Sequence, residues 1–285
     1  MWFTSWLRKW KSNPGTQGHS HRRPAAPRFR PCLEALEDRW MPSTLTVTNN
    51  LDSGHGSLRY EIARAQNKDT IVFAPSLDGQ TITLTSGELD ITAKSLTIEG
   101  PGANQLTVSG GHGSRVFEVA ATSSATLSGL TISNGYSVDG GAILNAGTLT
   151  VTGCTVSGSF ATNFGGGICN TGMLTVSACN LFGNTAVDDG GGIYNRGTAT
   201  VSNSTVGNAT LQNSAGYGGG IFNFNRGTLT VSGCTISGNN PSSHGGGIYN
   251  NGTVGALTVS NSTFSFNPPE NIYGPYTDGG GNTFS

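Results

Sequence analysis

Charged side chains are scarce in this sequence of 285 residues. Lysine, arginine, aspartate and glutamate together make up 11% of it, against roughly 25% in ordinary soluble domains. The net charge of −1 gives no electrostatic reason to expect nucleic acid or an anionic membrane as a partner. No stretch approaches the ~20 consecutive apolar residues of a transmembrane helix. The sequence therefore predicts neither a membrane span nor a nucleic-acid-binding protein.

Common signatures of metal and thiol chemistry are also lacking. The five cysteines include no Cys-x-x-Cys pair, and the five histidines are scattered along the chain. No calcium-binding nonapeptide of the Gly-Gly-x-Gly-x-Asp type is present. We therefore expect no metal site and no cofactor, and calcium is a candidate only if the chain is a polysaccharide lyase.

Glycine, with 44 residues, is abundant, and much of it lies in a six-residue block that recurs five times. The blocks are GGAILN at 140–145, GGGICN at 165–170, GGGIYN at 190–195, GGGIFN at 218–223 and GGGIYN at 245–250. Successive blocks are 25 to 28 residues apart. Periods in this range are typical of solenoids and other repeat arrays.

Two further short segments follow each glycine block, and both alternate apolar with small polar residues. The first of them contains Leu149/Val151, Leu174/Val176, Ala199/Val201, Leu229/Val231 or Leu257/Val259. Such alternation is typical of a half-buried strand, so each repeat holds three short strands. These strands bury their apolar faces only when successive repeats stack, about 4.8 Å apart. The sequence predicts an all-β fold, a single-stranded right-handed parallel β-helix.

Stacked repeats place equivalent residues in ladders along the axis. The expected asparagine ladder consists of Asn145, Asn170, Asn195, Asn223 and Asn250, and we interpret it as structural because amides hydrogen-bond from rung to rung. Cysteine alternates with serine at a second position, where Cys154, Cys179 and Cys234 are expected to fill the core. A disulfide between Cys154 and Cys179 is left open, since parallel side chains suit its geometry poorly. Cys169 is expected to face outward.

The first 43 residues differ from the repeats. They are rich in arginine, lysine and proline, which predicts a flexible, mostly disordered basic arm that is either an export or targeting signal or a nucleic-acid-binding arm. The segment RPCLEALEDRWMPS at 30–43 resembles a short motif near the start of many exported planctomycete proteins, and this resemblance implies export. We divide the chain into this arm, 1–43, and a β-helix, 44–285.

Residues 44–110 are expected to form the N-terminal cap and the first coils, with a short helix covering the open end of the core, as repeat arrays require. The helix would place Leu58, Ile62 and Ala65 on one face. This region, with GSLRYEI at 56–62, resembles the CSLREA-type module of bacterial surface β-helix proteins, although Gly56 replaces the usual cysteine.

The repeats at 140–285 resemble those of chlamydial polymorphic outer-membrane proteins, in which GGAI alternates with FxxN. In this sequence, LFGN at 181–184 and ISGN at 236–239 occupy the position of the FxxN motif. Together the resemblances imply a passenger-like β-helix of the pectin-lyase type outside the cell, and they imply no particular reaction. The partners to expect are an extracellular glycan or protein, and the expected oligomeric state is a monomer.

Enzymes of that fold cleave acidic polysaccharides with clustered carboxylates. The best cluster consists of Asp139, Asp188, Asp189 and Arg196. Asp139 and Asp189 are two rungs apart, about 9.6 Å by strand spacing, near the ~6.5–9.5 Å between the carboxyl groups of inverting glycosidases. Chance placement of acids in turns explains the spacing equally well, so a lyase or glycosidase is the alternative and not the preferred hypothesis.

Acids and rings alternate in the column just before the glycine blocks. Its expected members are Asp139, Phe164, Asp189, Tyr217, His244 and Asp278. Carboxylates accept hydrogen bonds from sugar hydroxyls and rings pack on sugar faces, so this column is the candidate ligand-binding surface. Solvated turn residues would give the same pattern. The sequence favours a non-enzymatic, adhesin-like scaffold on the surface or in a matrix, and an inert spacer remains a third hypothesis.

Overall fold

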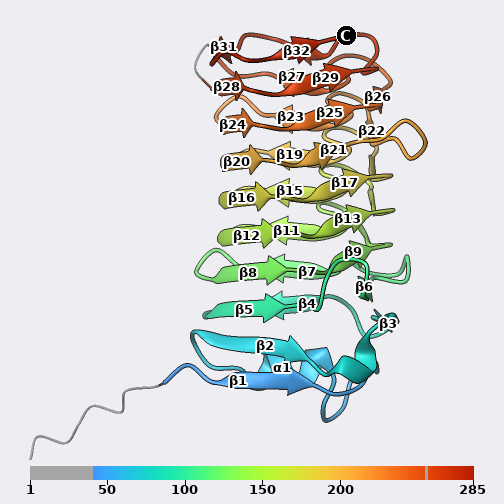
Figure 1. The fold of residues 1–285 in the computed structure, drawn as a ribbon, viewed down its shortest axis with the longest axis vertical. Coiled ribbons are helices and arrows are strands. Elements are labelled where there is room, and N and C mark those ends of the chain that lie inside the picture. Colours follow the sequence, from blue (N-terminus) through green and yellow to red (C-terminus); the bar gives the residue numbers. More distant parts are fainter. Residues whose placement is uncertain (1–40, 254–255) are drawn as a thin grey trace, which may run out of the picture. The chain divides into compact units, whose positions relative to one another are not determined.

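The computed structural model describes residues 41–253 and 256–285, and its main unit is Met41–Ser285. This unit is a right-handed parallel β-solenoid of about nine turns (Figure 1), which confirms the predicted fold. The arm predicted for residues 1–43 lies outside the described residues, apart from its last three. Each coil crosses three main sheets.

The sheet that follows each glycine block has ten strands. They are β1 (Thr44–Val47), β2 (Asp69–Phe73), β5 (Ser95–Glu99), β8 (Ser124–Ser128), β12 (Thr148–Thr152), β16 (Met173–Ser177), β20 (Thr198–Ser202), β24 (Thr228–Ser232), β28 (Leu257–Ser260) and β31 (Thr277–Asp278). All neighbouring strands pair in parallel.

The next sheet along each coil has nine strands. They are β3 (Gln80–Thr83), β6 (Leu106–Ser109), β9 (Thr131–Ser133), β13 (Thr155–Ser157), β17 (Asn180–Phe182), β21 (Thr205–Val206), β25 (Thr235–Ser237), β29 (Thr263–Ser265) and β32 (Thr283–Phe284).

The isoleucine of each glycine block begins a strand of the third sheet, which has eight strands. They are β4 (Leu89–Ile91), β7 (Phe117–Val119), β11 (Ile143–Asn145), β15 (Ile168–Asn170), β19 (Ile193–Asn195), β23 (Ile221–Asn223), β27 (Ile248–Asn250) and β30 (Ile272–Tyr273).

A small fourth sheet adds to the three strands per coil that the alternation predicted. Its five strands have two residues each, too few for an alternating pattern to reveal them. They are β10 (Tyr136–Ser137), β14 (Phe160–Ala161), β18 (Thr185–Ala186), β22 (Ser214–Ala215) and β26 (Asn240–Pro241).

A short helix, α1 (Leu58–Arg64), packs against the first coils, as predicted. Ser57 caps it by accepting a hydrogen bond from the backbone N–H of Tyr60, and Leu58 and Ile62 are buried. Gly56 has a φ of +80°, and a Cβ there would lie 2.2 Å from the hydroxyl oxygen of Thr48. The cysteine of the CSLREA-type module would therefore not fit this position without a change in the loop. A 3₁₀ turn, η1 (Pro75–Leu77), follows β2.

Inward-pointing residues of the three main sheets form one continuous core, from Leu45 in β1 to Phe264 in β29. The glycine blocks lie where the chain turns into the eight-stranded sheet. Gly190 has a φ of +69°, and a Cβ on Gly191 would lie 2.5 Å from the carbonyl oxygen of Gly219 on the next rung. Backbone conformation and close rung contact thus require glycine at this corner.

The five repeat asparagines form an uninterrupted hydrogen-bonded ladder at the end of the eight-stranded sheet. The side-chain amide of Asn145 donates to Asn170 at 2.7 Å, and each following pair is linked at 2.8 Å. All five are at most 2% exposed. Because each amide also bonds turn carbonyls, the ladder satisfies the polar groups of a buried corner.

A second asparagine ladder, at the end of the nine-stranded sheet, was not expected from the sequence. It consists of Asn184, Asn213, Asn239 and Asn267. The LFGN and ISGN motifs contain two of these residues, and their common position was the signal that could have predicted the ladder. Each amide also donates to a buried backbone carbonyl, at 2.8 to 2.9 Å.

The cysteine and serine stack also lies in the core. The backbone N–H of Cys154 donates to the sulfur of Cys179 at 3.4 Å, and that of Cys179 donates to the hydroxyl of Ser204 at 3.1 Å. Sulfur and hydroxyl are thus interchangeable acceptors here. The four cysteines of the described residues, Cys154, Cys169, Cys179 and Cys234, are free thiols.

Candidate functional site

The outer face of the eight-stranded sheet changes character along the solenoid axis. One outward residue from each strand forms a ladder, which we call the outer ladder. Its members in order are Asp90, Glu118, Leu144, Cys169, Tyr194, Phe222, Tyr249 and Tyr273. The ladder begins with acids, continues through an aliphatic side chain and a thiol, and ends with four rings.

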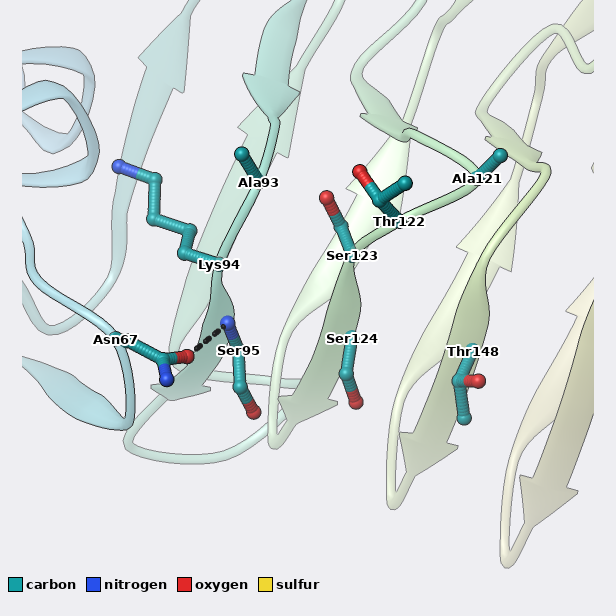
Figure 2. Close-up of a pocket in the computed structure, with 9 residues that line it drawn as sticks. All are labelled: Asn67, Ala93, Lys94, Ser95, Ala121, Thr122, Ser123, Ser124 and Thr148. Carbon is teal, nitrogen blue, oxygen red and sulfur yellow. Dashed lines mark hydrogen bonds between the residues drawn. The ribbon is translucent and has the colours of Figure 1, made fainter.

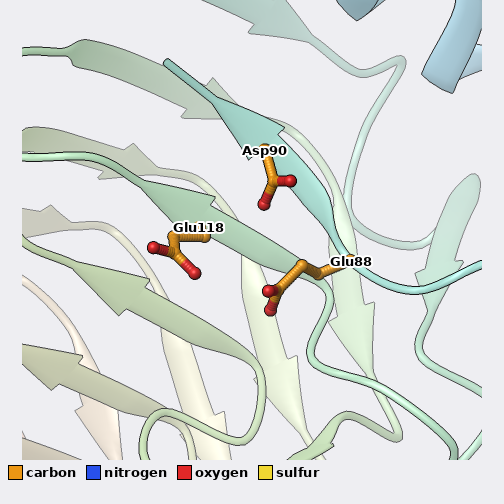
Figure 3. A group of neighbouring side chains, drawn as sticks. All are labelled: Glu88, Asp90 and Glu118. Atoms are coloured by element: carbon orange, nitrogen blue, oxygen red, sulfur yellow. The ribbon is translucent and has the colours of Figure 1, made fainter.

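Three carboxylates meet at the acidic end, those of Glu88, Asp90 and Glu118 (Figure 3). Their closest oxygens all lie within 4.8 Å of one another, and no other such group of three His, Cys, Asp or Glu ligands occurs in the described residues. Burial raises the pKa of Glu88 and of Asp90, and the charge of Glu118 adds to both shifts. Carboxylates so placed attract a positive charge.

The guanidinium of Arg115 supplies that charge from within the protein. Its Nη1 bonds Glu88 and lies 2.7 Å from a carboxylate oxygen of Glu118, and its other nitrogens donate to the backbone carbonyl of Asp139 and the hydroxyl of Ser137. The Arg115 side chain is 9% exposed. The sequence analysis gave Arg115 no role, although Asp90 and Glu118 lie on neighbouring rungs.

The aromatic end is a continuous stack. Ring centroids are 5.5 Å apart from Tyr194 to Phe222, 5.0 Å from Phe222 to Tyr249 and 4.8 Å from Tyr249 to Tyr273, and each pair is nearly parallel. The ring faces therefore lie against one another, and Tyr194 and Phe222 are only 5% and 4% exposed. Sugar rings need a free aromatic face for stacking, so the inner rings are not a glycan platform.

Flanking side chains cover this stack. Phe164 lies 4.7 Å from Tyr194, and Tyr217 meets Tyr249 edge-on at 5.2 Å. Cys169 belongs to the outer ladder, as the expectation of an outward side chain implied, but the surrounding rings leave it 4% exposed. Burial and the charge of Asp139 raise the pKa of Cys169 to about 12, so its thiol is protonated and a poor nucleophile near pH 7.

The predicted acid and ring column borders the outer ladder. Asp189 pairs with Phe164 on one side and with Tyr217 on the other. Asp139 accepts a hydrogen bond from the N–H of Phe164 at 3.3 Å, and the ring of His244 lies 6.5 Å from that of Tyr217. Asp139, Phe164, Asp189, Tyr217 and His244 thus follow one another on successive rungs.

Placing Asp278 in this column was wrong. Asp278 lies in β31 and pairs with Val259 of the ten-stranded sheet. Glu270 follows His244 instead: its carboxylate accepts from the N–H of Gly245 at 2.7 Å and lies 3.3 Å from Nδ1 of His244. The last coil is shorter, and the three glycines after Asp278 are not followed by the Ile-x-Asn of the other blocks. The position just before these glycines is therefore not equivalent to the position before a complete block.

The four catalytic candidates do not converge on one point. The rung of Phe164 separates Asp139 from Asp189. Arg196 follows β19, whereas Asp188 and Asp189 precede it, and the guanidinium of Arg196 lies over the ring of Phe224 at 5.8 Å. Burial raises the pKa of Asp189 to about 6, and the charge of Asp188 adds to the shift. Among these four residues, the raised pKa of Asp189 is thus the one feature that resembles an enzyme site.

A shallow cavity of about 510 Å³ lies away from this surface, at the edge of the ten-stranded sheet. Figure 2 shows its lining, which is mainly hydroxyls, including Ser95, Ser124 and Thr148. The ammonium of Lys94 donates to the carbonyls of Ile62 and Ala65 at the end of α1. The charge of Lys94 is therefore used in holding the helical cap.

No family model matches the chain, and no curated protein or solved structure matches it either. The family resemblances read from the motifs thus remain expectations. Among the described helices none is long and apolar enough to cross a bilayer.

Proposed function

We propose that this chain is a non-enzymatic β-helix scaffold that acts outside the cytoplasm and binds a glycan or a protein. The binding surface is the column Asp139, Phe164, Asp189, Tyr217 and His244. The observation that carries the proposal is that Tyr217 of this column is 40% exposed, while the inner rings of the neighbouring stack, Tyr194 and Phe222, are 5% and 4% exposed.

The chemistry of the column suits a partner rich in hydrogen-bond donors. Asp139 and Asp189 present carboxylates on alternate rungs, with Phe164 between them. Tyr217 and His244 present ring edges and polar atoms on the next two rungs. An elongated partner lying along the solenoid axis meets these groups one after another. Weak contacts repeated along a rigid support then add up to multivalent binding.

A screen of the full chain against neutral and acidic polysaccharides, with and without calcium, tests this proposal. Retention without cleavage is expected, and Tyr217→Ala weakens it about tenfold, as loss of an exposed aromatic contact does at binding surfaces. Tyr136→Ala is the matched control, because Tyr136 is similarly exposed on the five-stranded sheet and should leave binding unchanged. Equal losses for the two variants contradict the assignment of the surface.

A polysaccharide lyase or glycosidase is the second candidate, and the raised pKa of Asp189 favours it. A carboxyl group with a pKa of about 6 is suited to act as a general acid or base near neutral pH. Release of reducing ends or unsaturated sugars that Asp189→Asn abolishes would establish this function. If the chain neither binds nor cleaves any of the polysaccharides, the inert spacer is the hypothesis that remains.

The position outside the cytoplasm is part of the proposal and rests on the arm motif at 30–43. Fractionation of cells producing the full chain tests it, with a chain in which Leu36, Glu37 and Asp38 are all alanine as the comparison. Recovery of both chains in the cytoplasm contradicts export.

A further inference from the structure

The outer face of the ten-stranded sheet has a regularity that the column above lacks. Every one of its ten strands places a threonine at the same outward position. The ten are Thr44, Thr70, Thr97, Thr126, Thr150, Thr175, Thr200, Thr230, Thr258 and Thr277. We call this set the threonine ladder.

Hydroxyl side chains flank the threonine ladder on both sides. One flanking column is Ser128, Thr152, Ser177, Ser202, Ser232 and Ser260. The other is Ser95, Ser124, Thr148, Met173, Thr198 and Thr228, in which Met173 alone lacks a hydroxyl. Strands β8 to β28 contain no charged residue. The result is a neutral array of hydroxyls and methyls, three columns wide.

Strand formation alone does not require this array. The outer ladder of the eight-stranded sheet is built on the same coils, and it carries acids, leucine, cysteine and rings at outward positions. Even the core of the ten-stranded sheet varies, with Ala125, Leu149 and Ala199 at equivalent inward positions. Solvent-facing threonine is thus more uniform than the buried residues beside it.

Parallel stacking fixes the dimensions of the array. Neighbouring rungs are about 4.8 Å apart, and alternate residues of one strand are about 6.6 Å apart. Threonine is β-branched, so few rotamers are open to it and its hydroxyl and methyl are held in place. Oxygen rows in ice have a repeat close to the rung spacing. A partner that contacts the whole face at this regular spacing is itself a lattice. A single sugar or peptide contacts only a few of these hydroxyls and methyls.

A buried hydroxyl without a partner lies next to one of the flanking columns, although its side chain points away from the hydroxyls of that column in Figure 2. Ser123 is 5% exposed, and its hydroxyl has no hydrogen-bond partner. It lies beside the flanking column, where Ser95, Ser124 and Thr148 line the cavity of about 510 Å³ (Figure 2). A buried hydroxyl without a partner is normally satisfied by a bound water, and the cavity gives room for one next to the array.

We propose that the threonine ladder and its flanking columns bind the surface of ice, with hydroxyls and methyls ordering water in register with the crystal. From β8 to β28, the strands of the ten-stranded sheet carry neither charge nor aromatic rings. This distinguishes the partner from a crystalline polysaccharide, which carbohydrate-binding surfaces commonly hold by stacking on rings. The inference is independent of the glycan or protein partner proposed for the other face.

Thermal hysteresis and retention in slowly grown ice, measured on the full chain, test the inference. The unaltered chain is expected to shape ice and to be retained in it. Thr175→Tyr, at the centre of the ladder, is expected to reduce hysteresis to about a tenth, because one bulky side chain lifts several rungs off the lattice and multivalent binding is lost. Thr175→Val keeps the shape and should retain most of the activity.

Thr235→Tyr on the nine-stranded sheet is the matched control. Thr235 is also exposed and belongs to a threonine column, but Asn180 interrupts that column and Phe182 lies beside it. Unchanged hysteresis in Thr235→Tyr, with equal urea midpoints for all variants, supports the assignment. No hysteresis in the unaltered chain, equal losses in both tyrosine variants, or retention on crystalline cellulose or chitin in place of ice overturns it.

Discussion

The outer faces of the ten-stranded and the eight-stranded sheets are built on the same coils, yet they follow opposite rules. One repeats threonine in every strand, and the other changes from acid to ring along the axis. Beneath both faces the core is a single apolar column. The difference shows that the repeat keeps the inward residues apolar without making them identical, whereas each outward face is free to acquire its own chemistry.

The largest expected effect comes from a change at the corner next to the eight-stranded sheet. Asn195→Ala removes an amide that links Asn170 to Asn223 and that also donates to the carbonyls of Gly197 and Thr228. Buried partners left unsatisfied cost about 1–3 kcal/mol each, so we expect the free energy of unfolding to fall by about 3–4 kcal/mol. Urea denaturation measures it. A loss equal to that from an outward residue would contradict a structural role for the ladder.

Phe222→Ala and Thr230→Ala compare the two faces directly, since the two residues lie in successive strands of one coil. Phe222 is 4% exposed and packs between two rings, so its truncation should cost about 2–3 kcal/mol, less than in a closed core because water fills the gap. Thr230→Ala should cost under about 1 kcal/mol. Similar values in urea denaturation would mean that the hydroxyl face also supports the fold.

Arg115→Met tests the acidic end of the outer ladder. Removing the guanidinium leaves Glu88, Asp90 and Glu118 uncompensated, and because these carboxylates are partly exposed we expect a loss of about 2 kcal/mol at pH 7. Burial raises the pKa of Glu88 and Asp90, so protonation relieves the repulsion and the loss should shrink as the pH falls. Urea midpoints of both chains between pH 4 and pH 7.5 measure this. A loss independent of pH would indicate packing, not charge.

Asp189→Asn is expected to stabilise the fold slightly. The folded-state pKa of Asp189, about 6, is above its ordinary value of 3.8, so the ionised form is disfavoured in the folded chain. This cost is absent below pH 4, grows as the pH rises through 6 and is constant above. With a discount for partial exposure, the gain at pH 7.5 is about 1 kcal/mol, measurable as a higher melting temperature. Asp188→Asn should give a smaller gain, since it removes only the neighbouring charge.

Much of the fold could be predicted from the sequence because burial imposes periods on it. Alternation gave the strands, the spacing of the glycine blocks gave the coils, and the Leu58 and Ile62 face gave the helical cap. The two-residue strands and the second asparagine ladder were missed, because a strand of two residues has no period and Ser159 takes the place of asparagine in the coil before Asn184.

The candidate site was predictable only in part. The positions of the five column residues from Asp139 to His244 could be predicted because each directly precedes a glycine block. The prediction failed for Asp278, which lies after the last complete block. The Arg115 cluster and the burial of Cys169 depend on side chains that reach across rungs, and repeat spacing alone does not show which of them touch.

By itself, the sequence determined which residues point into the core and that successive coils stack, because apolar side chains alternating with polar ones are buried in only one register. Tertiary structure alone decided what the outward residues do. Stacking turned the rings of Tyr194 and Phe222 against each other, brought Arg115 between two carboxylates and aligned ten threonines in one column. Each of these outcomes depends on contacts between residues one coil apart, which exist only after the solenoid has closed.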